Sequence, residues 1–176
     1  MRMPMTLLAA AALTLPGIAA AQSNAQCLPQ REAEALFLYM APEVIRQTGV
    51  ACAANLPANA LLRRQGGAFL AKYQAESAGA WPLARNAIAR IAGADVRQIL
   101  DSQFAQPVVA SMMAPLLTAE LRGQDCPAIE RVVSLVEPLP ARNAAALVTT
   151  IIQLAGADRD AGRRLPLTVC PPGAAR

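Results

Sequence analysis

Apolar side chains recur at three- and four-residue steps along most of the chain, the spacing that gathers them on one face of an α-helix. Residues 29–49 show this first, with Leu36, Phe37, Met40 and Val44 on one stripe. No stretch has the sustained alternation of apolar and polar residues that predicts a half-buried strand. The pattern therefore predicts an all-α fold.

Prolines and glycines interrupt this pattern and set the expected ends of the helices. Pro42 and Pro107 are expected to kink or split the helices that contain them, and Gly66-Gly67 predicts a bend. Helices are expected to begin near Pro29, Pro57, Trp81, Asp95 and Cys126, with a last helix through residues 144–156. The prediction is a compact bundle of about six to eight short, proline-kinked helices, followed by an extended C-terminal tail over residues 165–169.

The helix that begins near Asp95 should bury one side and expose the other. Ile99, Leu100 and Phe104 are expected to face the core, while Arg97 and Asp101 form an exposed pair one turn apart.

The apolar run that follows, residues 108–117, contains the pair Met112-Met113. Methionine tolerates several packings, so this segment could line an adaptable hydrophobic groove or fill the core. Apolar residues make up 55% of the chain. These apolar residues could pack in the protein's own core or in a dimer interface.

The first twenty-one residues have the features of an export signal. Arg2 supplies a positive start, residues 6–15 are apolar, and residues 19–21 offer a small-residue cleavage site before Gln22. The apolar run is about ten residues long, whereas a spanning helix needs roughly twenty. We therefore expect a signal peptide over residues 1–21 and a single periplasmic or secreted domain over residues 22–176, without a transmembrane anchor.

The four cysteines are Cys27, Cys52, Cys126 and Cys170. An even number in an exported protein predicts two disulfides, and four cysteines allow three pairings. We favour Cys27 with Cys52 and Cys126 with Cys170, because each pair would bracket one compact stretch of helix. C-x-x-C spacing is missing, so redox exchange, haem attachment and ribbon-type zinc binding lack their signature.

The chain contains no histidine, which removes the commonest general base and the commonest metal ligand. Lys72 has no serine in an S-x-x-K arrangement, and Ser77 lies off its helical face, so we interpret Lys72 as a solvated charge. Glu32 and Glu34 are two residues apart, which puts them on different sides of a helix. We predict no catalytic residue, metal ligand or cofactor site.

Two further polar features have ordinary structural interpretations. Residues 158–162 begin like a calcium loop but lack its later ligands, which favours a polar turn. Arg63-Arg64 and Arg163-Arg164 are short basic pairs typical of solvated surfaces. The formal net charge is only +4, and export makes nucleic acid an unexpected partner.

The function that this sequence favours is a non-enzymatic protein-interaction or self-assembly module. The apolar run at residues 108–117 leaves a second function open, that of a carrier of an apolar ligand such as a fatty acid. A third is a hydrolase that works with two carboxylates and no histidine, for which the fold would have to bring two acidic side chains into one open cleft. Arginine in place of lysine, together with abundant alanine, suggests a bacterial source.

Overall fold

The computed structural model describes residues 27–157 and 168–171. Their fold is all-α, as the periodicity predicts, and it contains two disulfides. The helices are α1 (Gln30–Ala51), η1 (Leu61–Arg63), α2 (Ala68–Ala92), η2 (Ala94–Val96), α3 (Arg97–Leu100), α4 (Ala105–Thr118), η3 (Gly123–Asp125), α5 (Cys126–Val136) and α6 (Ala141–Ala157), where η marks a 3-10 helix. None of the described helices is long and apolar enough to cross a membrane.

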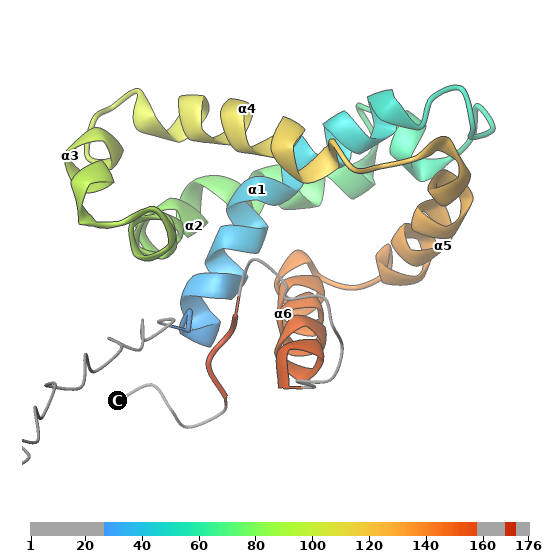
Figure 1. Ribbon diagram of the computed structural model, residues 1–176. Coiled ribbons are helices and arrows are strands. Elements are labelled where there is room, and N and C mark those ends of the chain that lie inside the picture. Colours follow the sequence, from blue (N-terminus) through green and yellow to red (C-terminus); the bar gives the residue numbers. More distant parts are fainter. Residues whose placement is uncertain (1–26, 158–167, 172–176) are drawn as a thin grey trace, which may run out of the picture.

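Helices α1 and α2 pair antiparallel and form the centre of the protein (Figure 1). Aromatic side chains fill their interface: the Tyr39 and Trp81 rings lie 4.9 Å apart, and the Phe69 and Tyr73 rings lie 5.3 Å apart. With Phe37, which packs edge-on against Tyr73, the interface holds five of the six aromatic residues in the chain. Burial of large aromatic surfaces is expected to supply much of the stabilisation here.

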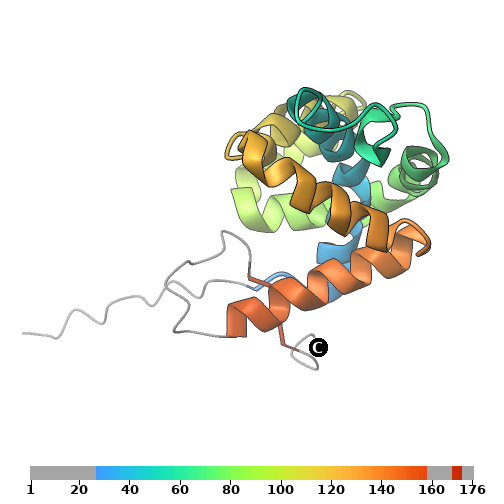
Figure 2. The same ribbon diagram turned by 90° about the vertical axis from the view of Figure 1, so that its right-hand side faces the viewer.

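Helices α4 and α6 also pack against α1, whereas α3 packs on α2 and α4, and α5 packs on η1. Helix α4 crosses one side of it, and α6 packs on the other side against α1 and α2 (Figure 1). The α6 contact is made by small buried residues, Ala141, Ala144 and Ala145, which let the backbones approach closely. Helix α5 lies between α4 and α6 in the chain, and Figure 2 looks onto α5 and α6 from the side.

Several predicted helix boundaries are wrong. Helix α1 continues through Pro42, so it is not split there, and it runs past Gly49, while α2 continues through Pro82. A proline inside a helix removes one hydrogen bond, but tertiary packing on both sides of it can hold the helix together. Trp81, which we expected to open a new helix, instead packs against Tyr39 in the middle of α2.

Glycines lie at both ends of α2. Gly67 is the N-cap of α2, so Gly66-Gly67 precedes that helix and does not bend it. Gly93 caps the C-terminus of α2 with φ at 97°, a conformation that side chains rarely adopt, and this turn folds η2 and α3 back onto α2.

The favoured disulfide pairing is also wrong, because the bonds join Cys27 to Cys170 and Cys52 to Cys126. The reason is the continuity of α1. Its 22 residues separate Cys27 from Cys52 by about 30 Å at 1.5 Å per residue, far beyond the reach of one disulfide. Both bonds therefore connect segments far apart in sequence, 143 and 74 residues respectively.

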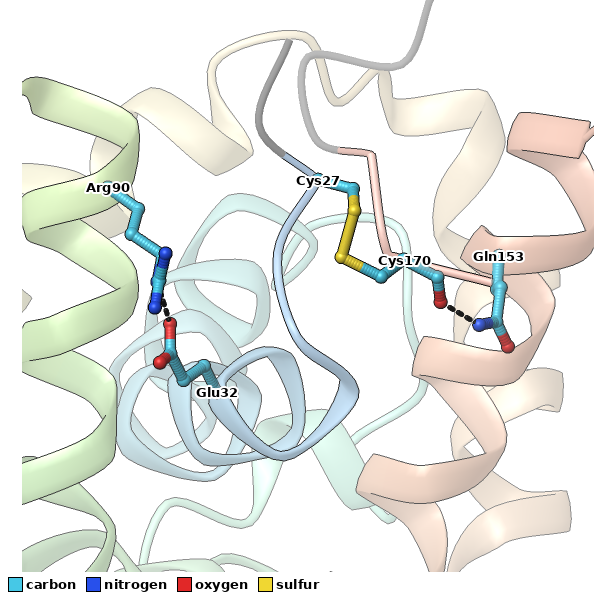
Figure 3. Close-up of a disulfide and its surroundings, with 5 residues drawn as sticks. All are labelled: Cys27, Glu32, Arg90, Gln153 and Cys170. Atoms are coloured by element: carbon cyan, nitrogen blue, oxygen red, sulfur yellow. Dashed lines mark hydrogen bonds and ion pairs between the residues drawn. A yellow bond between two sulfur atoms is a disulfide. The ribbon is translucent and has the colours of Figure 1, made fainter. Parts of the chain in front are cut away.

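Residues 168–171 form a strap that joins the start of α1 to the end of α6 (Figure 3). The Leu28 amide donates to the Thr168 carbonyl at 2.8 Å, and the Cys170 amide donates to the Leu28 carbonyl at 2.9 Å. The Gln153 side chain of α6 donates to the Cys170 carbonyl. Of the predicted tail at residues 165–169, the structure describes only residues 168 and 169. The predicted signal peptide lies outside the described residues.

The two tyrosines lead to a pH prediction. Burial raises the pKa of Tyr39 to about 12, although a backbone hydrogen bond at Ala110 opposes the shift, and burial also raises the pKa of Tyr73. Since the folded state holds the Tyr39 proton more tightly than an unfolded tyrosine at 10.0, its stabilisation is complete below pH 10 and is lost as the pH rises toward 12.

Alkaline titration followed by tyrosinate absorbance should therefore give a midpoint above that of the urea-unfolded chain. Tyr39→Phe should remove one of the two ionisations and leave that of Tyr73. A native titration that coincides with the unfolded one would contradict the burial of both hydroxyls.

Candidate interaction surface

Helix α4 carries an exposed row of large apolar side chains. Phe104, the N-cap residue of α4, is followed at four-residue steps by Val108, Met112 and Leu116, which places them along one side of the helix. Their exposed fractions are 66%, 47%, 67% and 75%. We call these four residues the α4 ridge. Helix α4 also contains no charged residue between its first position and its last.

The opposite side of α4 attaches it to α1. Ala105 and Ala114 are buried, Val109 and Met113 pack against the core, and the Tyr39 hydroxyl of α1 donates to the Gln106 carbonyl. Helix α4 is thus fixed through its small residues and one polar anchor, which leaves the ridge facing away from the core.

The prediction that Ile99 and Phe104 face the core is wrong, since both are 66% exposed. Leu100 is buried, as predicted. The run at residues 108–117, on which the carrier hypothesis rested, places Val108, Met112, Leu116 and Leu117 on the surface of α4. Helix α4 packs mainly against α1, with a smaller contact to α3, and these four side chains stay exposed.

Exposed apolar residues continue on the two helices that follow. These are Val132 and Leu135 on α5, and Leu147, Ile151 and Leu154 on α6. Three consecutive helices therefore each present apolar side chains to solvent. Single exposed apolar residues are ordinary on protein surfaces, whereas contiguous apolar patches are candidate sites of association, and α6 offers such a candidate beside α4.

Lys72 is not the solvated charge that we predicted. Its ammonium donates to the Glu137 and Leu139 carbonyls at 2.6 and 2.7 Å, and to the Val136 carbonyl at 3.4 Å. It also lies 5.0 Å from the centre of the Phe69 ring. A cation at the last carbonyls of a helix stabilises its C-terminus, so Lys72 of α2 holds the end of α5. Burial lowers the pKa of this amine, with an opposing contribution from the Glu137 carboxylate.

The carboxylates mostly pair with arginines. Glu32 pairs with Arg90 at 2.7 Å and Glu76 with Arg142 at 2.8 Å, so both join separate helices. Asp101 pairs with Arg85 at 2.7 Å and not with Arg97, which corrects the predicted pair. Glu32 and Asp101 line the same open pocket, where each carboxylate is occupied by a guanidinium.

Glu130 was missed by the sequence reasoning. It lies on α5, and its two carboxylate oxygens accept hydrogen bonds from the Leu61 and Leu62 amides at 2.6 and 3.2 Å. Glu130 thereby caps η1 from a neighbouring helix, beside the Cys52–Cys126 disulfide. Glu130 lies 69 positions from Leu61 in the sequence, so no local sequence pattern predicts this cap. The fold alone brings the two residues together.

The structure also places some of the other polar residues that the sequence analysis considered. Arg63 is not fully solvated, because its guanidinium donates to the Leu56 carbonyl at 3.0 Å. The Ser77 hydroxyl donates to the Tyr39 carbonyl at 3.1 Å and lies apart from the Lys72 contacts. The calcium-like segment at residues 158–162 and the pair Arg163-Arg164 lie outside the described residues.

No protein-family model, curated protein or solved structure matches this chain.

Proposed function

We propose that this protein is a non-enzymatic helical module of the periplasm or the extracellular space, and that it associates with a second copy of itself through the α4 ridge. The observation that carries the proposal is the row of four exposed apolar side chains on an uncharged helix. Two disulfides suit an oxidising compartment outside the cytoplasm.

The aromatic residues support the choice of α4. Five of the six lie in the interface of α1 and α2, whereas Phe104 lies at the start of the ridge with two thirds of its surface exposed. Exposed aromatic side chains are enriched among the residues that supply most of the energy of a protein interface. Burial of Phe104 would remove the largest apolar side chain of the ridge from water.

The absence of charge on α4 favours an identical partner. In a two-fold symmetric contact each surface meets a copy of itself, so charged residues near the axis would meet like charges. The ridge brings no such repulsion. Rows at four-residue spacing can also interdigitate with one another, in the commonest helix-packing class.

The position of the chain ends also favours a second copy over the chain's own remaining residues. Cys27, Ala157, Thr168 and Pro171 border the undescribed segments. The strap and Gln153 place these borders near the start of α1 and the end of α6, across α1 from α4 (Figures 1 and 2). The ridge is therefore remote from the points where the rest of the chain begins.

Sedimentation equilibrium over a range of protein concentrations tests the proposal. A contact centred on one helix is small by the standard of stable dimers, so we expect a reversible dimer with a dissociation constant on the order of micromolar. The double variant Met112→Glu/Leu116→Glu should weaken association at least about a hundredfold, because two buried charges would meet in each half of the interface.

The matched control is Leu147→Glu/Ile151→Glu, which places the same charges on exposed apolar positions of α6. It should leave the dimer intact. Circular dichroism establishes that each variant remains helical. The proposal is overturned by a wild-type protein that stays monomeric at high concentration, by equal losses in both double variants, or by a monomer whose α4 cross-links only to a different protein in native extracts.

A further inference from the structure

A polar pocket of about 410 Å³ opens between the start of α1, the second half of α2 and α3. Three arginines line it: Arg85 and Arg90 from α2, and Arg97 from the first position of α3. The pocket lies apart from the α4 ridge, none of whose residues lines it.

The fold builds this pocket from one face of α2 and a turn. Arg85, Asn86 and Arg90 fall on adjacent positions of the helix surface around Ala89. Gly93 then reverses the chain with its positive φ, so that α3 closes the far wall. Arg97, at the start of α3, thereby lines the same pocket as Arg90.

Two ion pairs position two of the guanidiniums. Arg90 donates through Nε to Glu32, whose side chain is only 12% exposed, and Figure 3 shows this pair beside the Cys27–Cys170 disulfide. Arg85 donates through one terminal nitrogen to Asp101. A guanidinium has five N–H donors in a planar fork, so each pair fixes the orientation of its arginine and leaves other donors at the pocket.

Arg97 completes the site, and it forms no ion pair with a described residue, because Asp101 one turn away is taken by Arg85. The lining therefore carries three positive and two negative side chains, a surplus of one positive charge. Two buried apolar residues, Ala89 and Leu100, form part of the floor.

From this arrangement we infer that the pocket binds a small organic anion, whose carboxylate or phosphate group contacts Arg97 and the free donors of Arg85 and Arg90. The charge surplus selects an anion, and the planar forks match the geometry of carboxylate and phosphate oxygens. The volume lies within the range of about 300 to 1,000 Å³ that is usual for small-molecule sites.

NMR titration of the arginine Nε–Hε resonances tests this inference in the full mature chain. The probes are inorganic phosphate and butyrate, each at constant ionic strength and pH. We expect saturable shifts at Arg85, Arg90 and Arg97, with small shifts at exposed arginines elsewhere. Saturation by phosphate alone identifies a phosphate site, and saturation by butyrate identifies a carboxylate site.

The variant Arg97→Gln should weaken binding of the active probe about tenfold, the size expected for one charge-assisted contact. Arg131→Gln is the matched control, since Arg131 is exposed on α5 outside the pocket and its loss changes the net charge equally. Unsaturated shifts spread over all arginines, or equal weakening in both variants, would overturn the inference. Because the titration does not depend on association, its failure would leave the α4 proposal intact.

Discussion

Replacement of Gly49 with alanine should lower the free energy of unfolding by about 3 kcal/mol, the upper range for overpacking a core. A Cβ at Gly49 would overlap the carbonyl oxygen of Leu62 and would lie 3.1 Å from its carbonyl carbon. That backbone cannot move aside easily, since Glu130 caps η1 and the Cys52–Cys126 disulfide lies beside it. Urea unfolding followed by circular dichroism measures the loss.

Gly79→Ala is the control for this substitution. Gly79 also lies inside a helix, α2, but a Cβ there would meet no atom within 4 Å. Alanine is the better helix former by about 1 kcal/mol, so Gly79→Ala should stabilise the protein slightly. If both substitutions stabilise it, the close approach of η1 to α1 is contradicted.

Removal of the Cys52–Cys126 disulfide should cost about 4 kcal/mol. On the chain-entropy account, a bond that closes 74 residues restricts the unfolded chain by roughly that amount. Both cysteines are fully buried against Leu56, Ala60 and Leu62, so the packing of η1 and α5 also depends on them. The variant Cys52→Ala/Cys126→Ala avoids free thiols, and its thermal and urea unfolding give the difference.

The bond itself can be located by mass spectrometry of a non-reduced tryptic digest. Each cysteine lies in a different tryptic peptide, and we expect residues 47–63 linked to residues 123–131. The other linked pair should join the peptide that ends at Arg31 to residues 165–176. A link between the peptides of Cys27 and Cys52 would contradict the structure.

The sequence predicts the helical class and the presence of two disulfides. The helical class follows from the local spacing of apolar residues, and the number of disulfides follows from the number of cysteines. The pairing could not be predicted because it depends on whether α1 continues through Pro42. That continuity comes from the packing of α1 between its neighbours, which proline propensity alone does not describe.

The exposed side of α4 could not be predicted from the sequence for a related reason. The sequence marks α4 as apolar, but both of its sides are apolar, so periodicity cannot tell which side α1 will cover. The hydrogen bond from Tyr39 and the packing of the small residues of α4 determine which side faces α1. The arginine pocket was equally hidden, since Glu32, Arg85 and Arg97 belong to three helices that the packing of α1 on α2 and the turn at Gly93 bring together.

The bond between Cys27 and Cys170 closes the described chain into a covalent ring, with the two Cα atoms 4.8 Å apart. A mechanical force applied to the residues before Cys27 and after Cys170 would therefore pass through one sulfur–sulfur bond. Helices α1 to α6 would lie outside the path of that load. Under oxidising conditions the domain would transmit tension without unfolding, and a reductant would put all of its helices under load at once.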